Sequence, residues 1–164
     1  MKRPSLLQKT LLATAAAFVL YPAGGVAAPD GVSSIRWGTV ALPSGQTLNV
    51  EIADTPALEQ RGYMFRDRVP EGEGMIFLFD SLEIHPFWMK NCRTSLDIIW
   101  IDEHWRVLHI VAGVPPCRED PCPTFGPMEK SQYVLEVASG GAARLGLKPG
   151  DRVTYLPPTP STNR

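Results

Sequence analysis

The sequence has few of the groups on which recognisable enzyme and metal sites depend. It holds only three cysteines and three histidines in 164 residues, and it contains no H-E-x-x-H zinc motif. It has no phosphate-binding P-loop, no G-x-G-x-x-G after a predicted strand and no G-x-S-x-G around a serine nucleophile. These absences leave zinc-protease, nucleotide-binding and serine-hydrolase chemistry without support.

The sequence also lacks a marked excess of charge of either sign. The formal net charge is -1, and it becomes -4 without residues 1–28, because that segment holds Lys2, Arg3 and Lys9 and no acidic residue. A mildly acidic domain binds nucleic acid poorly, since the phosphates attract basic surfaces. We therefore expect no nucleic-acid partner. The remaining sequence has no apolar run long enough to span a membrane, and it identifies no protein partner.

Residues 1–28 have the pattern of a secretory signal peptide. Basic residues precede a short apolar run at 11–20, and small residues precede an expected cleavage between Ala28 and Pro29. The run is shorter than the ~20 residues that a membrane span needs, although an uncleaved N-terminal anchor stays open as an alternative. We predict a periplasmic or secreted protein with the following parts: signal peptide 1–28, linker and first strand 29–38, β domain 39–156 and disordered tail 157–164.

Two of the cysteines lie close together in a proline-rich segment. Four residues separate Cys117 from Cys122, and in an oxidising compartment this spacing predicts a disulfide that closes a loop. A metal site and a redox pair are the alternatives, but zinc would need four clustered ligands and the redox motif has shorter spacing. Cys92 is left over and is expected to be a buried thiol, with no base placed beside it for a nucleophilic role.

Short apolar segments separated by turn residues predict a mainly β protein. The strands are expected at 35–42, 47–53, 75–79, 87–91, 98–101, 106–111, 133–137 and 153–156, and short helices at 54–61 and 139–145. Within 47–53, apolar residues alternate with Asn49 and Glu51, which predicts a hairpin with one solvated face. Elements of this kind pack as a single-domain β-sandwich or barrel with one or two short helices.

Polar residues inside these apolar segments define a candidate site. Period-two geometry over 85–91 places Asn91 on one face with Phe87 and Met89. An inward amide needs hydrogen-bond partners, which either a ligand or a neighbouring loop backbone can supply.

Two arginines flank the end of the first predicted helix. Arg61 and Arg66 lie on either side of Gly62 and can present a fork to a carboxylate or phosphate. Asp97 and Glu136 either position these arginines around a ligand or form structural salt bridges with them. Asp97 can instead cap a turn at the start of its strand.

The resulting hypothesis is that the domain binds a small polar or anionic ligand without a cofactor or a metal ion. The arginines would donate, Asn91 would orient the ligand, and two methionines would form an apolar wall. No catalytic residue is assigned; the candidate ligand-binding residues are Arg61, Met64, Arg66, Met89, Asn91, Asp97 and Glu136.

Three alternatives remain beside the binding hypothesis. The first is a hydrolytic enzyme with Asp97 or Glu136 as general base. The second is a copper site built from methionine and histidine side chains such as Met64, Met89 and His85. The third is a structural or interaction protein with an exposed apolar face.

The order of the motifs resembles the DUF192 family over nearly the whole mature chain. The matching pieces are Arg61–Arg66, Gly74–Phe77, Phe87–Asn91, Leu96–Ile98, Tyr133–Glu136 and Leu147–Asp151. The resemblance implies a compact β-sandwich or barrel with short helices, in a family whose members often carry signal peptides and have no assigned role. The family pattern usually has Leu at position 63 and Thr at position 92, where this chain has Tyr63 and Cys92. The second difference weakens a nucleophilic role for Cys92.

Overall fold

The described part of the chain, residues 35–159 of a computed structural model, is mainly β. The predicted signal peptide and the last residues of the predicted tail, 160–164, lie outside the described residues. The elements are β1 (Trp37–Ala41), β2 (Thr47–Ala53), α1 (Pro56–Arg61), β3 (Glu73–Glu83), β4 (Phe87–Trp88), β5 (Leu96–Ile101), β6 (Val107–Val114), β7 (Thr124–Phe125), β8 (Ser131–Ala138), α2 (Gly141–Arg144) and β9 (Thr154–Leu156). The predicted mainly β class with two short helices is confirmed.

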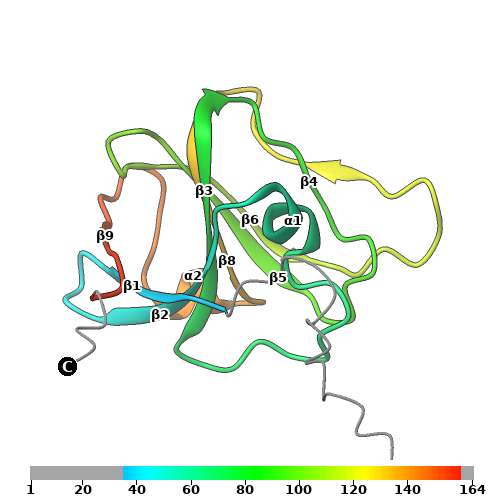
Figure 1. Cartoon of the computed structure of the whole chain (residues 1–164), viewed down its shortest axis with the longest axis horizontal. Coiled ribbons are helices and arrows are strands. Elements are labelled where there is room, and N and C mark those ends of the chain that lie inside the picture. Colours follow the sequence, from blue (N-terminus) through cyan, green and yellow to red (C-terminus); the bar gives the residue numbers. More distant parts are fainter. Residues whose placement is uncertain (1–34, 160–164) are drawn as a thin grey trace, which may run out of the picture. The chain divides into compact units, whose positions relative to one another are not determined.

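Seven strands form one mixed sheet in the order β6-β5-β8-β3-β2-β1-β9, and β4 pairs with β7 in a separate ribbon (Figure 1). β2 and β3 run parallel, whereas the other paired strands of the described residues run antiparallel. A parallel pair needs a crossover rather than a tight turn, and α1 lies within this crossover. No helix of the described residues is long and apolar enough to cross a membrane.

The sheet buries side chains on both faces. On one face, Ile76 and Leu135 pack under Ala142 of α2 and under Leu147. The other face lies behind α1 in Figure 1. On this face, apolar side chains of β3, β5 and β8 pack with Leu58 of α1 and Phe87 of β4. A strand that is covered on both faces has a nearly continuous run of apolar residues in its sequence. This is the case for β5, in which every residue is buried.

The predicted solvated face of the hairpin is confirmed for only part of β2. Asn49 is exposed as predicted, whereas Glu51 on the same face is only 5% exposed, because α1 and the chain after it cover that end of β2. Alternation identified the two faces of the strand correctly. It did not show that a helix covers the end that carries the carboxylate.

The strand predicted at 87–91 is wrong beyond Trp88, where β4 ends. The chain turns instead, and the Cys92 amide donates to the Met89 carbonyl at 3.2 Å. Asn91 adopts φ 58° and is exposed. Its predicted inward orientation is therefore wrong, since the period-two pattern holds only while the backbone stays extended.

The predicted disulfide is confirmed: Cys117 and Cys122 are bonded, with their Cα atoms 5.6 Å apart. The Cys117 amide donates to the Met89 carbonyl at 3.2 Å, which attaches the disulfide loop to the turn after β4. Cys92 is a free thiol and is half-buried rather than fully buried.

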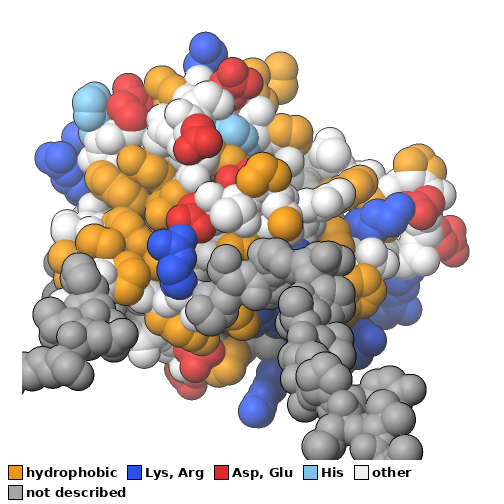
Figure 2. All heavy atoms as spheres, in the orientation of Figure 1, with side chains coloured by type: hydrophobic (Ala, Val, Ile, Leu, Met, Phe, Trp, Pro, Cys, Tyr) orange, Lys and Arg blue, Asp and Glu red, His pale blue; other side chains and the backbone are white. Residues whose placement is uncertain are grey.

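Aromatic rings cover the sheet near β9. The ring of Trp105 stacks on Tyr133, with centroids 3.8 Å apart, and on Tyr155, with centroids 5.5 Å apart. These rings pack against the buried residues of the first face. In Figure 2, hydrophobic side chains gather on the side where Figure 1 places β1 and β9.

Removal of the disulfide by the double substitution Cys117→Ala and Cys122→Ala is expected to lower the free energy of unfolding by about 2 kcal/mol, because the bond closes a small loop. Urea unfolding followed by circular dichroism measures the change. A reductant should lower the stability of the wild type to the level of the variant and leave the variant unchanged. Equal stability of the oxidised and the reduced wild type would contradict the prediction.

Candidate functional site

Asp97 is a buried acceptor for three backbone amides. The side chain of this residue in β5 is fully buried. Its Oδ1 accepts from the amides of Gly113 at 2.7 Å and Gly140 at 3.0 Å, and its Oδ2 accepts from the amide of Ala142 at 3.0 Å. Within residues 35–159, Asp97 forms no ion pair with an arginine. The carboxylate does hydrogen-bond to backbone amides, but these belong to β6 and to the start of α2 rather than to a turn at the start of its own strand.

Arg66 is engaged by a carboxylate that the sequence analysis did not select. Its guanidinium donates to both oxygens of Glu51, with 2.6 Å between Nη2 and Oε2. Its Cζ lies 5.1 Å from the centroid of the Tyr63 ring. Hydrogen bonding to Glu51 raises the pKa of Arg66. The sequence carries little signal for this pair, because Glu51 alternates with apolar residues as a solvated side chain does.

The methionines occupy different environments. Met75 and Met89 are buried in the core of the second face, at 4% and 1% exposure, whereas Met64 is half-buried. The His85 ring stacks on Phe79, with centroids 3.7 Å apart. Within residues 35–159, no group of three or more His, Cys, Asp or Glu residues is arranged to hold a metal ion.

A groove of about 430 Å³ lies between α1 and the turns around Met64 and Lys90. It brings together Arg61, Met64 and Asn91 of the predicted set, but not Arg66, Met89 or Asp97. Its walls are formed by Ala57, Gln60, Arg61, Met64, Phe65, Trp88, Lys90 and Asn91.

Two residues in uncommon backbone conformations join the walls of this groove. Phe65 and Asn91 have φ values of 66° and 58°, which few residues other than glycine adopt. The Phe65 amide donates to the Asn91 carbonyl at 2.8 Å, and the Asn91 Nδ2 lies 3.8 Å from the Met64 sulfur. Conformations of this kind tend to cluster at functional sites.

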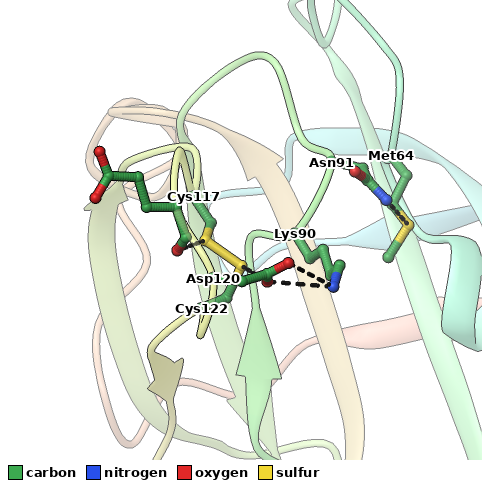
Figure 3. A network of polar contacts seen from close by, with 7 residues as sticks. Met64, Lys90, Asn91, Cys117, Asp120 and Cys122 are labelled. Carbon is green, nitrogen blue, oxygen red and sulfur yellow. Dashed lines mark hydrogen bonds and ion pairs between the residues drawn. A yellow bond between two sulfur atoms is a disulfide. The ribbon is translucent and has the colours of Figure 1, made fainter.

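Lys90 is a groove residue that the sequence analysis missed. Its Nζ lies 3.2 and 3.1 Å from the two carboxylate oxygens of Asp120, a residue within the disulfide loop. Figure 3 shows Lys90 reaching toward this loop while Asn91 turns toward Met64. Its position beside Asn91 in the same motif was the available signal. Lys90, rather than Arg66, is therefore the second cation of the groove.

Glu136 lines a small cavity that adjoins the groove. The cavity is about 30 Å³ in volume, and it shares with the groove the walls Gln60, Arg61, Met64, Trp88 and Lys90. Glu136 is 4% exposed, and its Oε2 has no hydrogen-bond partner among the described residues. Burial raises the pKa of this carboxyl to about 8.

Gly62 allows the end of α1 to approach the Glu136 carboxyl. It has φ 45°, and a Cβ atom at this position would lie 3.4 Å from the Phe77 ring and 3.6 Å from the Glu136 Oε2. These distances are ordinary van der Waals contacts, but a side chain here would be strained by the backbone. The positive φ therefore accounts for the glycine in the Arg61–Arg66 motif.

Two further ionisable groups line the same cavity. Burial, together with the negative charge of Glu136, raises the pKa of the Cys92 thiol to about 12. Burial also raises the pKa of the Tyr63 phenol. Both groups stay protonated at neutral pH, so Cys92 is not an activated nucleophile, because only a thiolate would attack.

Comparison with known proteins agrees with this fold. The model of the DUF192 family, described as an uncharacterized ACR, matches residues 39–155. A crystal structure of a protein of unknown function from Novosphingobium aromaticivorans DSM 12444 is 36% identical with a TM-score of 0.65, covering 83% of this chain and 91% of that one. A proposed transcription regulator from Sinorhizobium meliloti 1021 is 32% identical with a TM-score of 0.69, covering 76% of this chain and 98% of that one. No curated protein matches the sequence.

The substitution Glu136→Gln is expected to remove a fall in stability between pH 5 and 8.5. The folded pKa of about 8 exceeds the ordinary value of 4.5, so in this window the folded state keeps a proton that the unfolded chain has released. The resulting stabilisation is complete below pH 4.5 and is lost as the pH rises through 8. The wild type should lose about 3–5 kcal/mol relative to the variant by the end of the window.

Urea unfolding at several pH values measures this difference. Glu71→Gln is the matched control, because it makes the same change at an exposed loop residue, and its pH profile should follow the wild type. Parallel profiles for the wild type and Glu136→Gln would contradict the assignment of an unpartnered, protonated carboxyl.

Proposed function

This chain belongs to the DUF192 family, and from that premise we propose that it binds a small ligand with an anionic group. The family is described as uncharacterized, so the proposal depends on the groove between α1 and the turn after β4. The groove would hold the anionic group, and the adjoining cavity would hold another part of the same ligand.

The observation that carries the proposal is the environment of Arg61. This arginine is exposed, lines both the groove and the cavity, and forms no ion pair within residues 35–159. A guanidinium with unused donors is suited to a carboxylate or phosphate, which it can bind through two parallel hydrogen bonds. Arg61 is therefore the principal anion contact of the proposed site.

Lys90 and Asn91 support the same reading. The Lys90–Asp120 pair leaves 38% and 66% of the two side chains exposed. Exposed pairs of this kind contribute little to stability, so the ammonium can turn toward a ligand at small cost. Asn91 adds a neutral amide on the same wall, and Met64 provides apolar surface.

The remaining residues of the predicted set take supporting roles in this proposal. Arg66 is held by Glu51, Asp97 is held by three backbone amides, and Met89 packs in the core. Arg66 and Met89 fix the segments next to Arg61 and next to Lys90 and Asn91, whereas Asp97 fixes β6 and the start of α2. Glu136 is the predicted residue that adjoins the groove at its inner end.

Hydrolysis with a carboxylate as general base is the second candidate function. Asp97 is unsuited to it, since both of its oxygens are engaged by backbone amides. Glu136 fits better, because it lies in a cavity and its pKa of about 8 is near neutral pH. Turnover of an ester panel that disappears in Glu136→Gln would favour this candidate over simple binding.

The substitution Arg61→Gln is expected to weaken binding of small anions at least ~10-fold, since a hydrogen bond to a charged group contributes about 1.5–3 kcal/mol. Titration with acetate, propionate, butyrate and phosphate, followed by the fluorescence of Trp88, which lines the groove, measures the affinity. Arg93→Gln is the control, because Arg93 is exposed, pairs with Asp67 and does not line the groove. Equal affinities of the two variants, or no anion binding by the wild type, would overturn the proposal.

We also propose that the protein acts in the periplasm or outside the cell. The disulfide suits an oxidising compartment, and the predicted signal peptide 1–28 would direct export. The domain limits at 29–38, 39–156 and 157–164 are part of the same proposal.

The full-length chain, expressed with its N-terminal segment, is expected to yield a periplasmic protein that begins at Pro29. Intact-mass spectrometry of the periplasmic and membrane fractions measures the start of the chain. A substitution of Ala28 by a large residue such as Trp should block cleavage, because the processing site needs small residues. A full-length chain in the membrane fraction would support the anchor alternative instead.

A further inference from the structure

We propose that the cavity at Glu136 receives a primary ammonium group, so that the ligand of the groove is a zwitterion such as a small amino acid. This inference rests on the proposed function, because the groove supplies the contacts for the anionic end. It goes further by assigning a positive charge to the opposite end of the same molecule.

The walls of the cavity are suited to an organic cation. Four aromatic side chains line it, namely Tyr63, Phe77, Phe87 and Trp88. The rings of Phe77 and Phe87 meet edge to face, with centroids 4.9 Å apart. Aromatic faces attract ammonium groups, and proteins use cages of such rings to recognise them. The aromatic lining therefore makes the cavity suitable for an ammonium group.

Aromatic rings alone offer an ammonium group no strong hydrogen-bond acceptor, and the carboxyl of Glu136 supplies one. Its Oε2 is buried and has no hydrogen-bond partner in the described part of the chain. An ammonium group offers three donors and no acceptor. A buried carboxylate is costly unless it is paired, and a bound ammonium would supply both the opposite charge and the missing hydrogen bond.

The size of the cavity restricts the ammonium to a small one. A volume of about 30 Å³ accommodates a group about as large as one water molecule. A primary ammonium is of this size, whereas a trimethylammonium is much larger. The cavity thus favours amino acids over fully methylated amines.

Charged groups of both signs lie around Glu136. Arg61 from α1 and Lys90 from the turn after β4 line both the cavity and the groove, and both can donate to the anionic end of a ligand in the groove. Glu59 of α1 adds a second carboxyl to the cavity wall. On β2, Glu51 faces the same side of the sheet but is paired with Arg66. The site therefore offers donors for a carboxylate and acceptors for an ammonium group.

Tyr63 and Cys92 also border Glu136, and both stay protonated at neutral pH. Glu136 is then the group that changes its protonation when a ligand enters. An ammonium group beside it favours the ionised carboxylate, so binding should release a proton. A neutral ligand that accepts a hydrogen bond would instead keep the proton on Glu136.

Calorimetric titration of the whole mature domain tests this inference. The probes are glycine, β-alanine and 4-aminobutyrate, each compared with the acid of the same chain length without the amine: acetate, propionate and butyrate. Titrations at pH 6.5 in MES and in Bis-Tris, which differ in ionisation enthalpy, give the number of protons released. We expect at least one amino acid to bind ~10-fold or more tightly than its parent acid and to release close to one proton.

Two variants test the role of the Glu136 carboxyl. Glu136→Gln should abolish both the preference for the amine and the proton release while still binding the parent acids. Glu71→Gln makes the same change at an exposed residue that does not line the cavity, and it should preserve both properties. Preservation of the amine preference in Glu136→Gln would overturn the assignment of Glu136.

Other outcomes distinguish this inference from the proposed function. Equal binding of each amino acid and its parent acid, with dependence on Arg61, would overturn the ammonium site and leave the anion groove standing. Proton uptake on binding, or trimethylglycine binding as tightly as glycine, would also overturn the ammonium site. No binding of any acid would overturn both proposals.

Discussion

The carboxylate of Asp97 holds three separate segments of backbone together. From within the fully buried strand β5, it accepts hydrogen bonds from one amide near the end of β6 and from two amides at the start of α2. Without the carboxylate, the buried Ala142 amide would lose its partner, at about 1–3 kcal/mol, and the two part-buried hydrogen bonds from Gly113 and Gly140 would also be lost. This one side chain therefore helps to fix β5 between β6 and β8, the strand that carries Glu136.

The register of the sheet then places two carboxylates on one face. Glu51 of β2 lies opposite Met75 of β3, which lies opposite Glu136 of β8. Paired residues of neighbouring strands project to the same side. Glu51 is neutralised by Arg66, whereas the Glu136 Oε2 has no hydrogen-bond partner within residues 35–159. Buried polar groups are normally paired or hydrogen-bonded. Of these two carboxylates, Glu136 is the exception, and this is why we place the candidate site at the Glu136 cavity rather than at the Glu51–Arg66 salt bridge.

The sequence predicted much of the fold because local patterns are strong in this chain. The limits of β2 are those expected from alternation, and Thr55 with Pro56 begins α1 as predicted. The predicted site was recovered in part: Arg61 and Asn91 line the groove, although Asn91 does so from an exposed turn. Lys90 was missed because a lysine in a predicted strand reads as a solvated side chain.

Composition and periodicity alone determined the mainly β class, the disulfide and the family resemblance, because each depends on spacing along the chain. Ion pairs between residues far apart in the sequence depend on which strands become neighbours. The tertiary structure decides which strands are neighbours. Arg66 pairs with Glu51 rather than Asp97 because the parallel crossover through α1 brings the end of the helix over β2. Only this packing isolates Glu136 and raises its pKa, since burial is a property of the assembled layers and of no single segment.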